Sequence, residues 1–178
     1  MSPKDAKTAA DQVKKLLEVD AVKILGIEGV KHFKKSFVNE GFTDEKLEKW
    51  PELKPSTVKR KTKKNGSLAK ILHQEGHLAD AVDWDGDFNK GAVTFKNHRP
   101  YAEIHNEGGD INQGERSELF TRNRDDKNRF AKGTTSGKGL SFKARTIEMP
   151  QRQFMGESKV LEENVVGIIE KQLDKIFG

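Results

Sequence analysis

A long polar segment, residues 110–148, limits most strongly what this chain can fold into. It is rich in Asn, Gly, Ser, Thr, Arg and Asp and is almost devoid of aliphatic residues. Because burial of apolar surface drives folding, the hydrophobic core must come from the two flanking parts of the chain. So long a stretch without regular structure is unusual within a compact domain. We therefore expect one domain over residues 1–178, with residues 110–148 as an extended, mobile polar insertion that meets a partner.

Composition predicts a modest core beneath a strongly ionised surface. The 178 residues are 33% hydrophobic and 34% charged, and the length suits one domain. The absence of cysteine excludes disulfide bonds, thiolate metal sites and a cysteine nucleophile. No apolar stretch approaches the roughly 20 residues that cross a bilayer, and the first residues lead into a charged helix rather than an apolar leader. We expect a soluble protein made in the cytoplasm, without a membrane partner.

Two helices are predicted before residue 41. Ser2 and Pro3 suit the cap and first position of a helix that ends near Val19. Asp20 can cap a second helix, and Gly41 is a natural stop for it. The apolar side of this second helix is spaced alternately by three and four residues, and the glycines near that side indicate close approach of another backbone. This side comprises Val22, Leu25, Gly29 or Val30, Phe33 and Phe37, with Gly26 nearby.

The rest of the chain predicts an α+β fold. An antiparallel β-sheet is expected, with N-terminal and C-terminal helices packed against it and a long polar loop insertion. The hairpin strands are expected around residues 78–84 and 92–95, and residues 143–149 could return to the sheet. Short helices are expected over residues 44–50, from Ser67 to a break at Gly76, and over residues 101–106, and a long terminal helix begins at Glu157 and Ser158.

Positive charge is concentrated in one run between residues 54 and 70. The net charge is +5, and this run contains no acidic residue. One interpretation is a solvated linker with a basic bias, and the other is a patch that faces nucleic acid or an acidic partner. The basic residues of the run are Lys54, Lys59, Arg60, Lys61, Lys63, Lys64 and Lys70.

Catalytic and metal-binding motifs are weak. His73 and His77 resemble the paired histidines of zinc proteases, but the acid is displaced by one place and Gly76 interrupts the helix that would align them. His105 is the candidate third ligand in this less favoured hypothesis. No pair of carboxylates is placed in an apolar setting that would separate their pKa values. We therefore predict no catalytic residue, no cofactor and no metal.

Three large side chains call for structural interpretations. Trp50, beside Pro51, is expected to anchor a loop onto the core, and Tyr101 is expected to do the same through its hydroxyl. Arg152 lies between Pro150 and a phenylalanine. It could sit at a defined rim and bind a carboxylate of a neighbouring subunit, or it could be an ordinary exposed arginine.

Short motifs in fixed order resemble the bacteriophage virion morphogenesis family, often called tail completion proteins. The resemblance covers roughly residues 22–177, with the order and spacing of the motifs more specific than any one of them. Gln74 and Glu75 stand where threonine is common, and the polar segment is unusually long. The matching residues are Phe33, Phe37, Trp50-x-x-Leu53-x-x-Ser56-Thr57, Leu72-x-x-x-Gly76-x-Leu78, Tyr101-Ala102-x-x-His105-x-x-Gly108 and Pro150-x-Arg152-x-Phe154-x-Gly156.

This resemblance implies a non-enzymatic structural protein. Such proteins complete the tail or join head to tail, contact other neck or tail proteins, and commonly form rings, a hexamer being one candidate size. The protein would assemble in the cytoplasm of the bacterial host and become part of the virion. A lumen lined by the lysine run with Arg116, Arg122, Arg124 and Arg129 would suit non-specific contact with DNA. The alternative function is a basic, sequence-independent nucleic-acid-binding domain.

Overall fold

The computed structural model describes residues 3–65, 70–73, 75–118, 120–124, 130–132 and 140–177. The chain is α+β, as predicted, and it divides into two compact units. Unit 1 comprises Met1–Glu107 and Pro150–Gly178, and unit 2 comprises Gly108–Met149. In the described residues, the strands form small two-stranded antiparallel sheets rather than one larger sheet.

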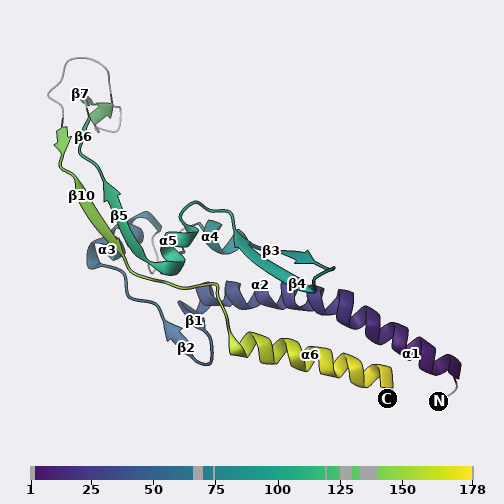
Figure 1. The fold of residues 1–178 in the computed structure, drawn as a ribbon. Coiled ribbons are helices and arrows are strands. Elements are labelled where there is room, and N and C mark those ends of the chain that lie inside the picture. Colours follow the sequence, from purple (N-terminus) through teal and green to yellow (C-terminus); the bar gives the residue numbers. More distant parts are fainter. Residues whose placement is uncertain are drawn as a thin grey trace. The chain divides into compact units, whose positions relative to one another are not determined.

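Unit 1 begins with an uninterrupted helical rod. Helix α1 (Pro3–Lys15) passes through the π-helix η1 (Leu16–Asp20) into α2 (Ala21–Asn39), as Figure 1 shows. Pro3 therefore begins a helix as predicted. The predicted break at Asp20 is wrong, because Asp20 is itself helical, with φ -74° and ψ -34°, and makes no side-chain cap. Helix α2 ends where Glu40 adopts a left-handed conformation with φ 51°, one residue before the predicted stop at Gly41.

A β-hairpin packs on the amino-terminal half of α2. Strands β3 (Val82–Asp87) and β4 (Ala92–Asn97) pair so that Trp84 lies opposite Phe95. A Cβ atom at Gly26 would overlap the Trp84 ring, and one at Gly29 would overlap the Phe95 ring. The glycines thus permit close packing, but against aromatic side chains and not against another backbone as we expected.

The C-terminal helix α6 (Lys159–Phe177) packs against α2 and α1. Its predicted start is confirmed, since Ser158 Oγ accepts a hydrogen bond from the Leu161 amide at 3.2 Å. Asp44 Oδ1 also accepts a bond from the Lys159 amide at 2.9 Å. The first turn of α6 is therefore fixed by its own cap and by the segment that follows α2.

Several short elements differ from the prediction. Residues 44–50 are not helical, because β1 (Gly41–Thr43) turns back to pair with β2 (Leu47–Lys49). Ser67 lies outside the described residues, and Ile71 and Leu72 form a turn in which Leu72 has φ 49°. The first hairpin strand begins at Val82, after a helical turn. The helices of this region are α3 (Pro55–Asn65), α4 (His77–Asp80) and α5 (Ala102–Glu107), of which only α5 was predicted.

Aromatic side chains dominate the core of unit 1. The Phe37 ring lies 5.6 Å from that of Trp50 and 5.1 Å from that of Phe154, and Phe33 meets Phe95 edge to face at 4.9 Å. Such tilted and edge-on contacts add specificity to the burial of apolar area. The buried cluster comprises Phe33, Phe37, Phe42, Trp50, Ile71, Leu78, Val82, Ala102, Phe154, Leu161 and Val165.

Unit 2 contains paired strands, although we expected no regular structure there before residue 143. Strand β5 (Gly109–Gln113) pairs with β10 (Arg145–Met149), so the predicted strand is present but does not join the hairpin of unit 1. Backbone hydrogen bonds and polar side chains hold these strands, with Thr146 Oγ1 donating to Asn112 Oδ1 at 2.8 Å. The other pairs are β6 (Arg116–Glu118) with β9 (Leu140–Phe142) and β7 (Phe120–Arg124) with β8 (Phe130–Lys132).

The glycines beneath the hairpin give a stability test. Gly29→Ala should destabilise the protein by about 1–3 kcal/mol, because the new methyl group must displace the Phe95 ring. The matched control is Gly167→Ala on α6, where a Cβ meets nothing within 4 Å. That variant should be stabilised by up to about 1 kcal/mol, since alanine favours helix. Urea unfolding measures both, and equal stability of the two variants would contradict this packing.

Candidate interaction surfaces

Arg152 is a buried clamp within unit 1. Its side chain is only 6% exposed, and its guanidinium donates to the Pro51 carbonyl from Nε at 3.1 Å and from Nη2 at 3.0 Å. Nη2 also donates to the Glu52 carbonyl at 3.3 Å. Burial lowers the pKa of Arg152 from its ordinary value. Both expectations for this residue, a rim position and an exposed side chain, are therefore wrong.

The segment around Arg152 is held by contacts to distant parts of the chain. Phe154 is fully buried, and Trp50 Nε1 donates to the Gln153 carbonyl at 2.6 Å, which confirms Trp50 as an anchor. Asn106 Oδ1 accepts bonds from the Phe154 and Met155 amides at 2.9 and 3.0 Å. Sequence reasoning missed Asn106, although it lies inside one of the recognised motifs. We define this lock as residues 150–156, which begin at Pro150 and end at Gly156, together with Trp50 and Asn106.

His105 lies beside the lock. Its carbonyl accepts a bond from the Arg152 amide at 2.8 Å, and its ring meets that of Tyr101 edge to face at 6.1 Å. Burial, and secondarily the positive charge of Arg152, lower the pKa of His105. Its Nδ1 atom is buried without a hydrogen-bond partner in the described structure. Tyr101 is 41% exposed and packs on His105, so the expectation that it anchors a loop onto the core is wrong.

Helix α3 presents the positive charge of the lysine run. The side chains of Lys59, Arg60 and Lys63 are exposed, and no carboxylate among the described residues forms an ion pair with them. We considered residues 54–70 as a possible solvated linker, but residues 55–65 of this run form a helix. Lysine and arginine favour helix, and Pro55 suits its first turn.

Lys61 has a different position from its neighbours. Its Nζ donates to the Lys70 carbonyl and, at 3.1 Å, to the His73 carbonyl. Burial lowers its pKa, Glu40 opposes that change, and Arg152 and Arg60 add to it. Glu40 Oε1 also accepts a bond from the Ile71 amide at 2.6 Å. Lys61 thus ties α3 to the turn that follows it and has less freedom to face a partner.

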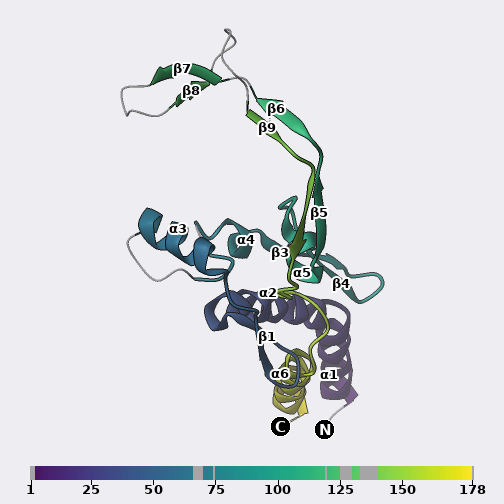
Figure 2. The same ribbon diagram turned by 90° about the vertical axis from the view of Figure 1, so that its left-hand side faces the viewer.

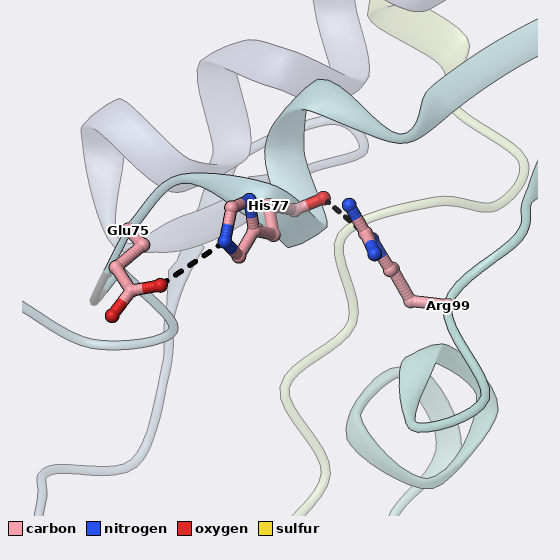
Figure 3. Close-up of polar contacts among 3 residues, drawn as sticks. All are labelled: Glu75, His77 and Arg99. Atoms are coloured by element: carbon pink, nitrogen blue, oxygen red, sulfur yellow. Dashed lines mark hydrogen bonds and ion pairs between the residues drawn. The ribbon is translucent and has the colours of Figure 1, made fainter.

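One of the histidines considered as metal ligands, His77, is part of a surface contact. His77 Nε2 lies 3.1 Å from Glu75 Oε2, and the Arg99 side chain donates to the His77 carbonyl at 3.4 Å, as Figure 3 shows. Gly76, between Glu75 and His77, has φ 82°, which favours glycine. Among the residues with described placement, no group of three potential ligands gathers that could hold a metal ion.

The remaining predicted residues divide into two groups. Leu53 and Leu72 are partly buried and pack against the core of unit 1. Arg122 and Arg124 lie in β7, but the structure does not describe their side chains or that of Lys64. Arg129 lies outside the described residues altogether.

Within the described chain, no helix is both long and apolar enough to cross a membrane.

These surfaces belong to a small α+β protein whose exposed features are a basic helix and narrow β-ribbons. The family model described as the phage virion morphogenesis family matches residues 47–174. The chain therefore belongs to the phage virion morphogenesis family, as its motifs predicted, and this membership indicates a structural or assembly role in the phage particle. No curated protein and no solved structure shows a significant match to the chain.

The Arg152 clamp makes a testable contribution to stability. Arg152→Met should destabilise unit 1 by about 1–3 kcal/mol, because it leaves the carbonyls of Pro51 and Glu52 without their buried donor. Arg60→Met is the matched control, since it removes the same charge from the exposed face of α3 and should change stability by at most about 0.5 kcal/mol. Thermal or urea unfolding measures both, and similar effects of the two substitutions would refute the clamp.

The lowered pKa of His105 predicts a pH dependence of stability. As pH falls through the ordinary value of 6.5, the unfolded chain binds a proton before the folded chain does. Stability is therefore retained above that value and declines below it. In urea titrations at about pH 7.5 and about pH 5.5, His105→Gln should reduce this decline. His73→Gln, which changes an exposed histidine, should leave it intact, and an unaltered decline in His105→Gln would exclude the effect.

Proposed function

We propose that this protein is a non-enzymatic structural component that completes the tail or joins head to tail in a tailed phage or prophage particle. The observation that carries the proposal is the family match over residues 47–174, which includes the lock around Arg152. The lock uses its polar groups to hold the chain together. These polar groups form hydrogen bonds within the chain. The lock is therefore suited to hold the surfaces that contact other proteins in place.

The β-ribbons of unit 2 support contact with other neck or tail proteins. Two-stranded sheets are only marginally stable alone, and their outer edges carry unpaired backbone groups that another chain can use. Asp110 lies directly opposite Glu148 in the β5–β10 pair, where like charges disfavour pairing. A partner that supplies backbone pairing or positive charge would stabilise such a ribbon.

A ring of identical copies is the assembly that we propose. A closed ring requires each copy to present two different surfaces to its two neighbours. A hexamer is one candidate size. In this proposal the protein becomes part of the virion after assembly in the cytoplasm of the bacterial host.

Helix α3 supports a second candidate function, sequence-independent binding of DNA. Its exposed Lys59, Arg60 and Lys63 could neutralise phosphates without reading bases. Binding of this kind weakens steeply with added salt. Absence of duplex binding at low salt would exclude this candidate without affecting the assembly role.

Deletion of the coding sequence tests the assembly role. Lysates of the deletion phage should contain unjoined heads or unfinished tails in electron micrographs, because the joining component is missing. Supplying the wild-type gene in trans should restore infectious particles. Normal, infectious particles from the deletion phage would refute the proposed function.

A further inference from the structure

The β3–β4 hairpin has one bare face. Its inner face, with Trp84 and Phe95, packs on α2, so alternate residues of β3 point to the opposite face of the hairpin. These outward residues are Asp83, Asp85 and Asp87. The hairpin is a two-stranded sheet, and no described element covers this outer face.

The bare face carries more acidic side chains than basic partners that pair with them. Lys96 forms an ion pair with Asp85, and Lys90 lies 3.6 Å from Asp87. Asp83 has no ion pair with any described residue, and its Oδ1 accepts only a bond from the adjacent Trp84 amide at 2.8 Å. Exposed pairs of this type contribute little to stability. A row of cations could therefore bind here without disrupting the hairpin.

Helix α3 of the same sequence carries a matching row. Lys59 and Lys63 are one helical turn apart, which places their Cβ atoms about 5–6 Å from each other. Alternate residues of a strand repeat at about 6.6 Å, so the spacing of Asp83 and Asp85 is similar. Helix α3 also exposes an apolar side chain, Val58.

The two surfaces lie apart within unit 1. The hairpin packs over Gly26 and Gly29 of α2, whereas α3 lies beyond the carboxyl-terminal end of that helix, and both views show them separated (Figures 1 and 2). Different, complementary surfaces at separate places on one protomer are what a head-to-tail contact requires.

We propose that α3 of one copy docks on the outer face of the β3–β4 hairpin of the next copy. This inference rests on the proposed ring and identifies its interface. Lys59 and Lys63 of one copy face Asp83 and Asp85 of its neighbour. DNA is the less favoured occupant of α3, because the phosphate backbone explains neither the matching acidic face nor the exposed Val58.

A charge exchange between copies tests this contact. One variant carries Lys59→Glu with Lys63→Glu, and the other carries Asp83→Lys with Asp85→Lys. Asp87 is kept because it accepts hydrogen bonds from the Asn89 and Lys90 amides of the turn. Sedimentation velocity of each full-length protein, over a range of concentrations at low salt, measures self-association. Wild type should associate. Each variant alone should associate at least about tenfold more weakly than wild type, because like charges then face each other.

An equimolar mixture of the two variants should restore association, since each exchanged surface then meets its complement. The control Lys171→Glu with Lys175→Glu, the same change at the same spacing on exposed positions of α6, should associate like wild type. Far-ultraviolet circular dichroism checks that every variant is folded.

Three results would overturn the inference. These are a wild type that stays monomeric at every concentration, a mixture that does not recover association, and variants that associate normally. Duplex binding that the α3 variant loses and the mixture does not restore would assign α3 to DNA instead. The deletion phenotype is independent of this interface, so unjoined heads together with a failed exchange would refute the interface and leave the proposed function standing.

Discussion

The burial of Arg152 is the constraint on which the rest of unit 1 depends. A guanidinium can be removed from water only if its donors find acceptors, and here the carbonyls of Pro51 and Glu52 serve that purpose. The same segment inserts Phe154 into the aromatic core and receives a bond from Trp50. Hydrogen bonding of the guanidinium and burial of the Phe154 ring therefore fix one short segment together.

This lock has consequences for the exposed surface. The carbonyls that Arg152 binds lie shortly before α3, which begins at Pro55, so the clamp holds the chain near the start of that helix. Lys61 ties the helix to the turn at residues 70–73, and Glu40 holds Ile71 in the same turn. Two basic residues, Arg152 and Lys61, thus make hydrogen bonds within the chain, while Lys59, Arg60 and Lys63 remain at the surface. Binding residues cannot be assigned here by charge alone.

Local patterns predicted the long helices, although they placed a break at Asp20 where the chain stays helical. The spacing of Phe33 and Phe37 indicated α2, and Glu157 with Ser158 indicated the start of α6. Local patterns failed where distant contacts decided the outcome. Residues 44–50 have helix-forming side chains, yet the left-handed Glu40 sends the chain into the β1–β2 pair. Helix α3 lacks an apolar stripe, so the spacing of apolar residues gave no indication of it.

The candidate site was less predictable than the fold. Arg152 lies between Gln151 and Gln153. Nothing in these neighbours indicates that backbone carbonyls about a hundred residues earlier accept its hydrogen bonds. The strands of unit 2 pair with few apolar residues, and sequence patterns that rely on hydrophobic alternation do not detect such pairing. The ordered motifs predicted the family correctly, because their order and spacing are shared by its members. Physical reasoning about single residues does not identify a family.

Imaging of the purified virion by cryo-electron microscopy tests the central claim most directly. The account predicts a closed ring of density at the neck or at the end of the tail, into which copies of unit 1 fit with the lock of residues 150–156 intact. Virions whose neck and tail contain no density for this chain, with the protein also absent from their mass spectra, would contradict it.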